Sequence, residues 1–172
     1  MRAGHDATGR GGFTLVEILI VVAILGFLVM MAVSSFRGLD EKYKVESETK
    51  QLFGDLMDVR GRAMQRNRFY HVAFTTNGYA TFEDASPAPE GDSNPANGAN
   101  HPVVNVTVKH SITTVRDGGG AMDNVTFNRN GIPDVTGHLR FASSAKPDYD
   151  CITIRATRIK MGKMNGATCV EK

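Results

Sequence analysis

The sequence predicts an α+β protein in which a long N-terminal helix, membrane-spanning in its first half, packs on a C-terminal antiparallel β domain. Residues 18–33 contain no charged or strongly polar side chain, and a helical pattern of apolar residues continues beyond them to residue 66. After residue 66, short alternating apolar segments are separated by Gly, Pro and Asn, as is typical of strands and turns. We therefore divide the chain into residues 1–12, 13–36, 37–66 and 67–172.

The composition favours one globular domain behind the apolar segment. The chain has 172 residues, 41% of them hydrophobic, with a formal net charge of +2. A domain of ordinary size needs no more than the residues that follow the apolar segment. The net charge is too small to indicate a nucleic-acid partner by itself.

The N-terminal region combines a short leader with an apolar helix. Residues 1–12 carry Arg2 and Arg10 against Asp6, so we expect the leader on the cytoplasmic side. As a helix, residues 13–36 extend about 36 Å, enough to cross a hydrocarbon core of about 30 Å. The small residues of a cleavage site precede this run, whereas a secretory signal carries them after it. A plain single-pass membrane anchor is the simpler interpretation.

Glu17 argues against a plain anchor. A carboxylate inside a bilayer is costly, so an acid in such a segment indicates a function. Cleavage after Gly12 would create an amine on Phe13, four residues before Glu17 and therefore one helical turn away. Glu17 would then neutralise the amine of its own chain or of a neighbouring one.

Residues 12–17, with the sequence Gly-Phe-Thr-Leu-Val-Glu, and the apolar run after them resemble the class III signal of type IV pilins and type II secretion pseudopilins. The resemblance implies that a prepilin peptidase cleaves after Gly12 and methylates Phe13. It also implies that Glu17 pairs with the N-terminus of a neighbouring subunit during filament assembly. The protein would be a single-pass protein of the bacterial inner membrane with a periplasmic β domain, joined to other pilins through their N-terminal helices. Many major pilins have a proline about where Ser34 stands here, so we expect a more continuous helix.

The second part of the helix is amphipathic. Leu52, Leu56, Val59 and Ala63 follow one another at spacings of four, three and four residues, and charged residues occupy the opposite face. This stripe predicts a helix up to residue 66 that packs one face against the β domain.

The β domain begins with a predicted hairpin. Alternating residues 70–74 and 79–82 flank Asn77-Gly78, a strong hairpin signal. Residues 83–102 contain four prolines among polar residues and predict a long flexible loop. A second turn is expected at Asn130-Gly131. Further strands are expected at residues 103–109, 125–127, 133–135, 138–141 and 151–154.

Two C-terminal segments narrow the resemblance. Residues 125–131, Val-Thr-Phe-Asn-Arg-Asn-Gly, look like the strand–turn segment of the minor pseudopilin family that includes GspH of type II secretion and FimT of type IV pili. Residues 154–160, Ile-Arg-Ala-Thr-Arg-Ile-Lys, look like the late strand of the same family. In DNA-binding FimT proteins the second segment leads into a Gly-Arg-x-Arg motif. Here the matching residues are 157–160, Thr-Arg-Ile-Lys, with Thr for the glycine and Lys for the second arginine.

The C-terminal strands are basic, which leaves two interpretations open. Arg155, Arg158, Lys160 and Lys163 are candidates for contacts with DNA phosphates. Charged residues also commonly protect exposed sheet edges, so an ordinary solvated edge strand explains the same pattern.

Cys151 and Cys169 are the only cysteines. An oxidising compartment outside the cytoplasm would favour a disulfide between them, worth about 3 kcal/mol by the chain-entropy estimate. Two unrelated free thiols are the alternative.

The sequence shows no pattern of catalytic or metal-binding residues. The histidines at positions 5, 71, 101, 110 and 138 lack metal-ligand spacing, and no nucleophile motif is present. We therefore expect neither an enzyme nor a cofactor or metal. The leading hypothesis is a minor pilin or pseudopilin that a prepilin peptidase processes. The alternatives are a pilus-associated DNA-binding protein and a membrane protein unrelated to filaments.

Overall fold

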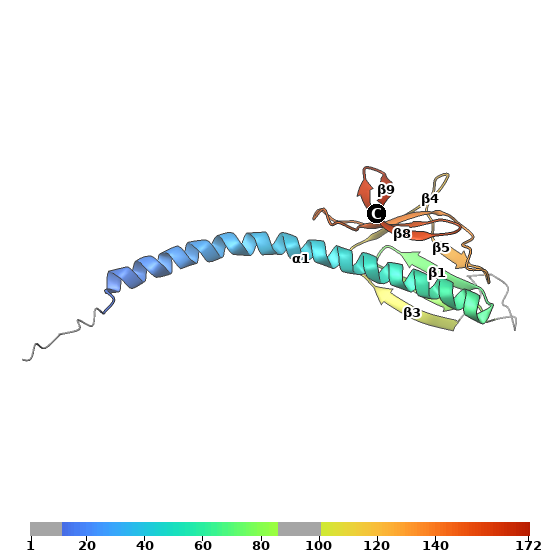
Figure 1. Ribbon diagram of the computed structural model, residues 1–172, viewed down its shortest axis with the longest axis horizontal. Coiled ribbons are helices and arrows are strands. Elements are labelled where there is room, and N and C mark those ends of the chain that lie inside the picture. The colour runs from blue at the N-terminus through green and yellow to red at the C-terminus, as the bar shows by residue number, and fades with distance from the viewer. Residues whose placement is uncertain (1–11, 86–100) are drawn as a thin grey trace, which may run out of the picture. The chain divides into compact units, whose positions relative to one another are not determined.

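The computed structural model describes residues 12–85 and 101–172. The chain divides into two compact units, residues 1–38 and 39–172, and each is described by itself. Most of the predicted leader, residues 1–11, lies outside the described residues, as does the part of the predicted loop at residues 86–100. The elements appear in the order α1 (Leu15–Arg66), β1 (Tyr70–Thr75), β2 (Gly78–Glu83), β3 (His101–Thr107), β4 (Ile112–Arg116), β5 (Asn124–Phe127), β6 (Gly137–Phe141), β7 (Cys151–Ile154), β8 (Ile159–Asn165) and β9 (Thr168–Glu171) (Figure 1).

The predicted α+β fold with an N-terminal helix is confirmed. Helix α1 starts two residues after Phe13 and ends at the predicted residue, Arg66. We expected residues 13–36 to span a membrane. In residues 12–85 and 101–172, no helix has the length and apolar character that a membrane crossing requires.

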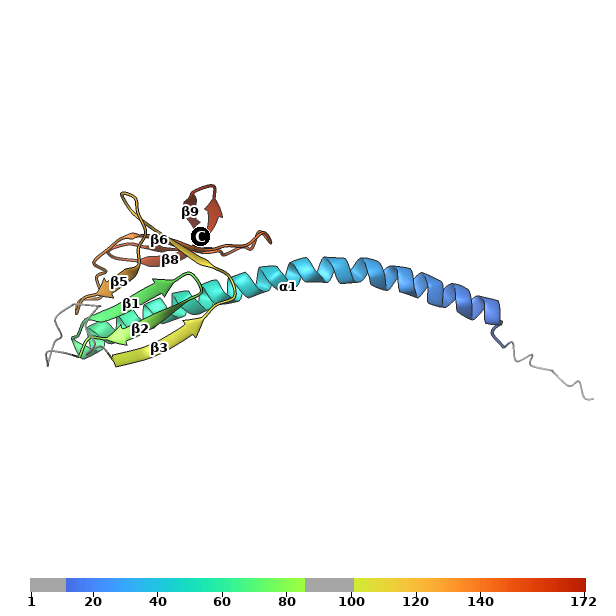
Figure 2. The ribbon, with the colours of Figure 1, turned by 180° about the vertical axis from the view of Figure 1, so that it is seen from behind.

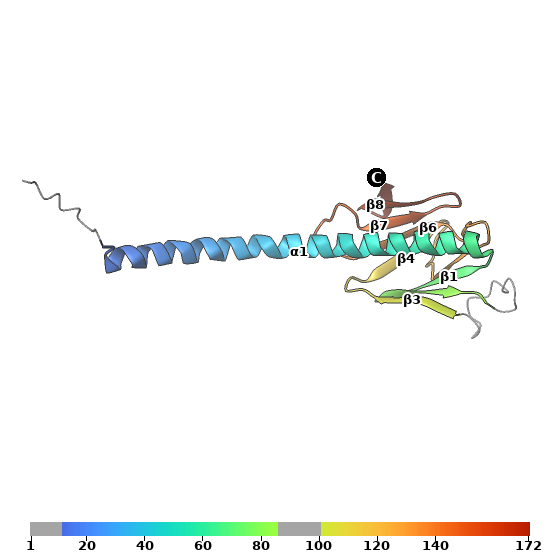
Figure 3. The same cartoon turned by 60° about the horizontal axis from the view of Figure 1, so that its bottom comes forward.

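Within the second unit, α1 buries the predicted apolar stripe. The buried positions follow spacings of three and four residues, which place them on one face of a helix. Each of them is at most 1% exposed: Val45, Thr49, Leu52, Leu56, Val59 and Ala63. This face meets the strands, and Figure 3 shows the C-terminal part of α1 lying along them.

The strands form two antiparallel sheets with the orders β3-β2-β1-β5 and β4-β6-β7-β8-β9. Side chains from both sheets join the face of α1 in one core. Its largest fully buried members from the strands include Tyr70, Tyr79, Phe127, Leu139 and Ile152.

The first hairpin forms where it was predicted, but its turn lies one residue earlier. Thr75 pairs with Gly78, so Thr76 and Asn77 form the turn and Gly78 is the first residue of β2. Glycine is required at position 78 because β3 packs closely against it, not because of the turn. A Cβ at this position would lie 2.3 Å from the carbonyl oxygen of Val106 on β3, so only glycine fits there.

The other strand predictions are mostly confirmed. Predicted strands 103–109, 125–127, 138–141 and 151–154 correspond to β3, β5, β6 and β7. Gly131 has the positive φ, 70°, that the second predicted turn needs. The strand predicted at residues 133–135 is wrong, because Pro133 makes only an isolated bridge to Phe127. Strand β4 and the hairpin of β8 and β9 had not been predicted. The late strand expected at residues 154–160 is wrong, because β7 ends at Ile154, the chain turns, and β8 begins at Ile159.

Candidate functional site

The N-terminal segment places Gly12 and Phe13 immediately before α1, in non-helical backbone. Thr14 caps the helix, because the backbone N–H of Glu17 donates to Thr14 Oγ1 at 3.2 Å. The backbone N–H of Ile18 donates to the Thr14 carbonyl, also at 3.2 Å, which closes the first turn. Thr14 and Glu17 thus occupy the two positions of a capping-box pattern, Thr-x-x-Glu.

Glu17 therefore has a local structural role that the sequence interpretation missed. Its carboxylate sits in the first turn of α1, where the helix dipole favours a negative charge. The signal was present in the spacing of Thr14 and Glu17.

The apolar side chains of the first unit face outward. Phe13 is 79% exposed, and every Leu, Ile, Val, Phe and Met from Phe13 to Met31 is exposed. A contiguous apolar surface of this extent marks a surface that other molecules cover. Burying each such side chain would contribute about 1.5–3 kcal/mol.

The second group of candidate residues lies in the turn between β7 and β8 (Arg155, Arg158) and on β8 (Lys160, Lys163). Arg155 forms an ion pair with Asp117, the residue that directly follows β4. Arg158 and Lys160 both approach Glu171 of β9, at 3.3 Å and 3.5 Å. The tertiary structure thus supplies three of the four predicted DNA-contact cations with acidic partners.

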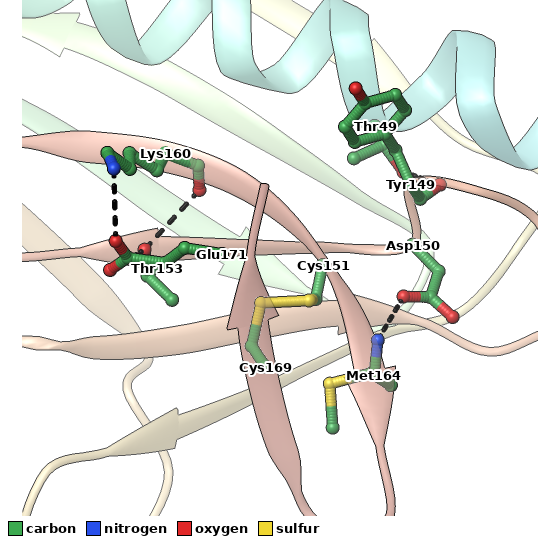
Figure 4. Close-up of a disulfide and its surroundings, with 9 residues drawn as sticks. All are labelled: Thr49, Tyr149, Asp150, Cys151, Thr153, Lys160, Met164, Cys169 and Glu171. Atoms are coloured by element: carbon green, nitrogen blue, oxygen red, sulfur yellow. Dashed lines mark hydrogen bonds and ion pairs between the residues drawn. A yellow bond between two sulfur atoms is a disulfide. The ribbon is translucent and has the colours of Figure 1, made fainter.

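Glu171 is the centre of this group. Its Oε1 accepts a hydrogen bond from Thr153 Oγ1 of β7 at 3.0 Å, and Figure 4 shows Lys160 beside the same carboxylate. The hydrogen bond from Thr153 and the charges of Arg158 and Lys160 lower the pKa of Glu171. The acid therefore stays ionised and neutralises part of the basic surface.

Cys151 and Cys169 form a disulfide with a Cα–Cα distance of 6.0 Å (Figure 4). It joins β7 to β9, which are separated in the sheet by β8. The bond passes over Gly162 of β8, where a Cβ would lie 3.0 Å from the Cys169 sulfur. The disulfide holds the C-terminal strand on the sheet, and the glycine at position 162 leaves room for its sulfur.

A cluster around His110 was not predicted. His110 Nδ1 lies 2.7 Å from Glu48 Oε2, and Nε2 lies 2.7 Å from Glu41 Oε1. Glu48 also accepts the backbone N–H of Lys109 at 2.7 Å. Glu41 and Glu48, two helical turns apart on α1, thereby bind the segment that follows β3.

The surroundings of His110 shift the pKa values within this cluster. The His110 side chain is only 6% exposed. Burial by itself lowers the pKa of His110, but its hydrogen bonds and ion pairs with Glu41 and Glu48 outweigh burial and raise the pKa. The hydrogen bond from His110 lowers the pKa of Glu41.

Comparison with known proteins bears on the N-terminal segment. Residues 8–33 match the family model of the prokaryotic N-terminal methylation motif. The chain carries a type IV pilin-like signal. Neither a curated protein nor a solved structure matches the chain.

The pilin-like signal contains Gly12, Phe13 and Glu17. A signal of this kind indicates a membrane-anchored, pilus-associated protein that a prepilin peptidase processes and that assembles with other pilins. It is a structural, pilin-type motif rather than an enzyme motif.

Proposed function

We propose that this chain is a minor pilin or pseudopilin of the GspH/FimT family, cleaved after Gly12 and methylated at Phe13. It joins a type II secretion pseudopilus or a type IV pilus as a structural subunit. The observation that carries the proposal is the methylation motif at residues 8–33, which includes the start of α1 and the exposed apolar side chains from Phe13 to Met31.

The local geometry suits each step of this process. The bond between Gly12 and Phe13 lies in exposed, non-helical backbone, so a peptidase can bind it without unwinding α1. The new amine on Phe13 would be positive and would lie at the positive end of the helix dipole, an unfavourable position. Glu17, in the first turn, supplies the opposite charge for this amine or for that of a neighbouring subunit.

The exposed apolar residues of α1 would pack against the helices of other subunits. The gain of about 1.5–3 kcal/mol for each buried side chain makes a bundle of such helices favourable. The Cys151–Cys169 disulfide supports a periplasmic β domain, because an oxidising compartment favours such a bond.

The first test is the mass of the mature N-terminus. The full chain, expressed with a prepilin peptidase, should lose residues 1–12 and gain one methyl group on Phe13. Gly12→Ala should block processing, whereas Gly11→Ala serves as the matched control and should be processed. Mature wild-type protein that keeps Met1, or normal processing of Gly12→Ala, would exclude the proposal.

A second test separates the two roles of Glu17. Glu17→Gln keeps a side chain of the same shape for the capping box but removes the charge. It should be cleaved normally and fail to copurify with filaments, and Glu17→Asp should recover part of the assembly. Normal incorporation of Glu17→Gln would show that the charge has no role in assembly.

DNA binding in uptake is the second candidate function. Its support is the charge balance of this surface, where Arg155, Arg158, Lys160 and Lys163 outnumber their acidic partners Asp117 and Glu171. A DNA titration of the full chain at several salt concentrations tests it, because each phosphate contact contributes about −0.9 to the log–log slope. Binding that Arg158→Ala weakens would support DNA contact, and no binding at low salt would exclude it.

A further inference from the structure

Strand β3 is an edge strand that, in the part of the chain that the structure describes, lacks the usual protection. Its residues, His101–Thr107, include no Lys, Arg, Asp or Glu, and β2 is its neighbour in the sheet. Figure 2 shows β3 at the outer side of β2. Natural edge strands are commonly protected by charges, short length or covering segments.

The other edges of the two sheets have such protection. Strand β4 carries Arg116, and the four-residue β9 carries Glu171. Strand β5 is bridged to Pro133. Among residues 12–85 and 101–172, β3 has no such protection beyond Pro102 near its start, so in this part of the chain its backbone is open to pairing.

The register identifies the open backbone groups. The N–H of Val108 donates to the carbonyl of Asn77 at 2.9 Å, on the β2 side. Because the direction alternates along an antiparallel strand, Val106 also points toward β2. Asn105 and Thr107 then point their N–H and C=O groups away from the sheet, and both residues are exposed. The next outward N–H, of Lys109, is already bonded to Glu48.

We infer that β3 is a self-association site, at which a second copy of this chain pairs its own β3 in antiparallel orientation. The two outward residues are arranged symmetrically about Val106. A two-fold axis at Val106 pairs Asn105 of each chain with Thr107 of the other, and each such pair exchanges two hydrogen bonds.

The side chains fit this register. The half-buried Val106 meets its own copy at the axis, and the position of Val104 lies opposite that of Val108 of the other chain, whose side chain is buried in its own core. No like charges meet, since β3 is uncharged. Main-chain donors and acceptors at regular spacing recognise another strand, and an uncharged edge offers nothing to a polyanion.

The pair has a consequence for assembly. A two-fold interface is closed, whereas a filament grows through heterologous contacts between subunits that all point the same way. The β3 pair therefore belongs to subunits outside the filament.

Cysteine cross-linking of the full chain in detergent tests this pairing. Two Val106 residues at the axis would have Cα atoms about 4.5 Å apart, within the range of a disulfide. Val106→Cys should form a disulfide-linked dimer under mild oxidation. Mixing the variants Asn105→Cys and Thr107→Cys should also give a dimer, because these positions face each other about 5.5 Å apart.

Thr113→Cys, exposed on the edge strand β4, is the matched control for collisions caused by the apolar helix. It should give far less dimer than Val106→Cys at the same concentration. If the mixed Asn105→Cys and Thr107→Cys variants give no more dimer than this control, the inference is wrong, even where Val106→Cys disturbs folding. Cross-links between β3 and another strand of a second chain would equally overturn it. Asn105→Lys, which puts a charge on the edge, should abolish pairing.

Discussion

Replacing His110 by glutamine should remove a pH-dependent part of the stability of the β domain. The imidazole of His110 bridges Glu41 and Glu48, at 2.7 Å from each carboxylate. Glutamine offers an NH2 donor group and a carbonyl acceptor but no charge, so the two carboxylates lose the cation between them. The hydrogen-bonded contact between α1 and the segment after β3 is then weakened.

The size of the effect follows from the better buried contact. The side chain of Glu48 is 16% exposed, and that of Glu41 is 36% exposed, so solvent screens the Glu41 contact more. A hydrogen bond to a charged group contributes about 1.5–3 kcal/mol. We expect His110→Gln to lower the free energy of unfolding by about this amount at mildly acidic pH, through the lost bond to Glu48.

The pH dependence has two limits. The folded pKa of His110 is raised, so its contribution is complete below its unfolded pKa of about 6.5 and is lost as pH rises through the folded value. The folded pKa of Glu41 is lowered, so its contribution is complete above about pH 4.3 and is lost as pH falls through the folded value. The contact of His110 with Glu41 and Glu48 is therefore strongest between these two pH limits.

Urea unfolding of the full chain in detergent, followed by circular dichroism, measures the difference between wild type and His110→Gln. The difference should be largest near pH 5.5 and should shrink toward pH 9. His101→Gln, at an exposed histidine, is the control and should show no such trend. A difference between wild type and His110→Gln that stays constant over this range would refute the argument.

Three further substitutions test the packing of the β domain, each by urea unfolding. Gly78→Ala should destabilise by about 1–3 kcal/mol, because its Cβ would overlap the backbone oxygen of Val106; an unchanged midpoint would contradict that contact. Gly54→Ala, on α1 with open space around the new Cβ, should instead stabilise by about 0.8–1 kcal/mol, and a loss would show that another group occupies this space. Cys151→Ser should cost about 3 kcal/mol and make the protein insensitive to reductant; an equal effect of reductant on both proteins would argue against the bond to Cys169.

The regular elements were largely predictable because their signals are local. The apolar stripe of α1 repeats within a few residues, and Asn77-Gly78 located the first hairpin to within one residue. Strand β4 escaped prediction because its sequence, Ile-Thr-Thr-Val-Arg, shows no clear alternation of apolar and polar residues. The pilin-like signal is local for the same reason, since a peptidase recognises a short continuous segment.

The sequence by itself determined the type IV pilin-like signal within residues 8–33, the amphipathic helix and most strands, since each depends on neighbours along the chain. Only the tertiary structure decided which charges meet. It brought Asp117 to Arg155 and Glu171 to Arg158, so the basic C-terminal strands are less positive than their sequence indicates. It also placed His110 against helix residues more than 60 positions earlier. Such contacts depend on how the sheets pack on the helix, and no local pattern of residues specifies that packing.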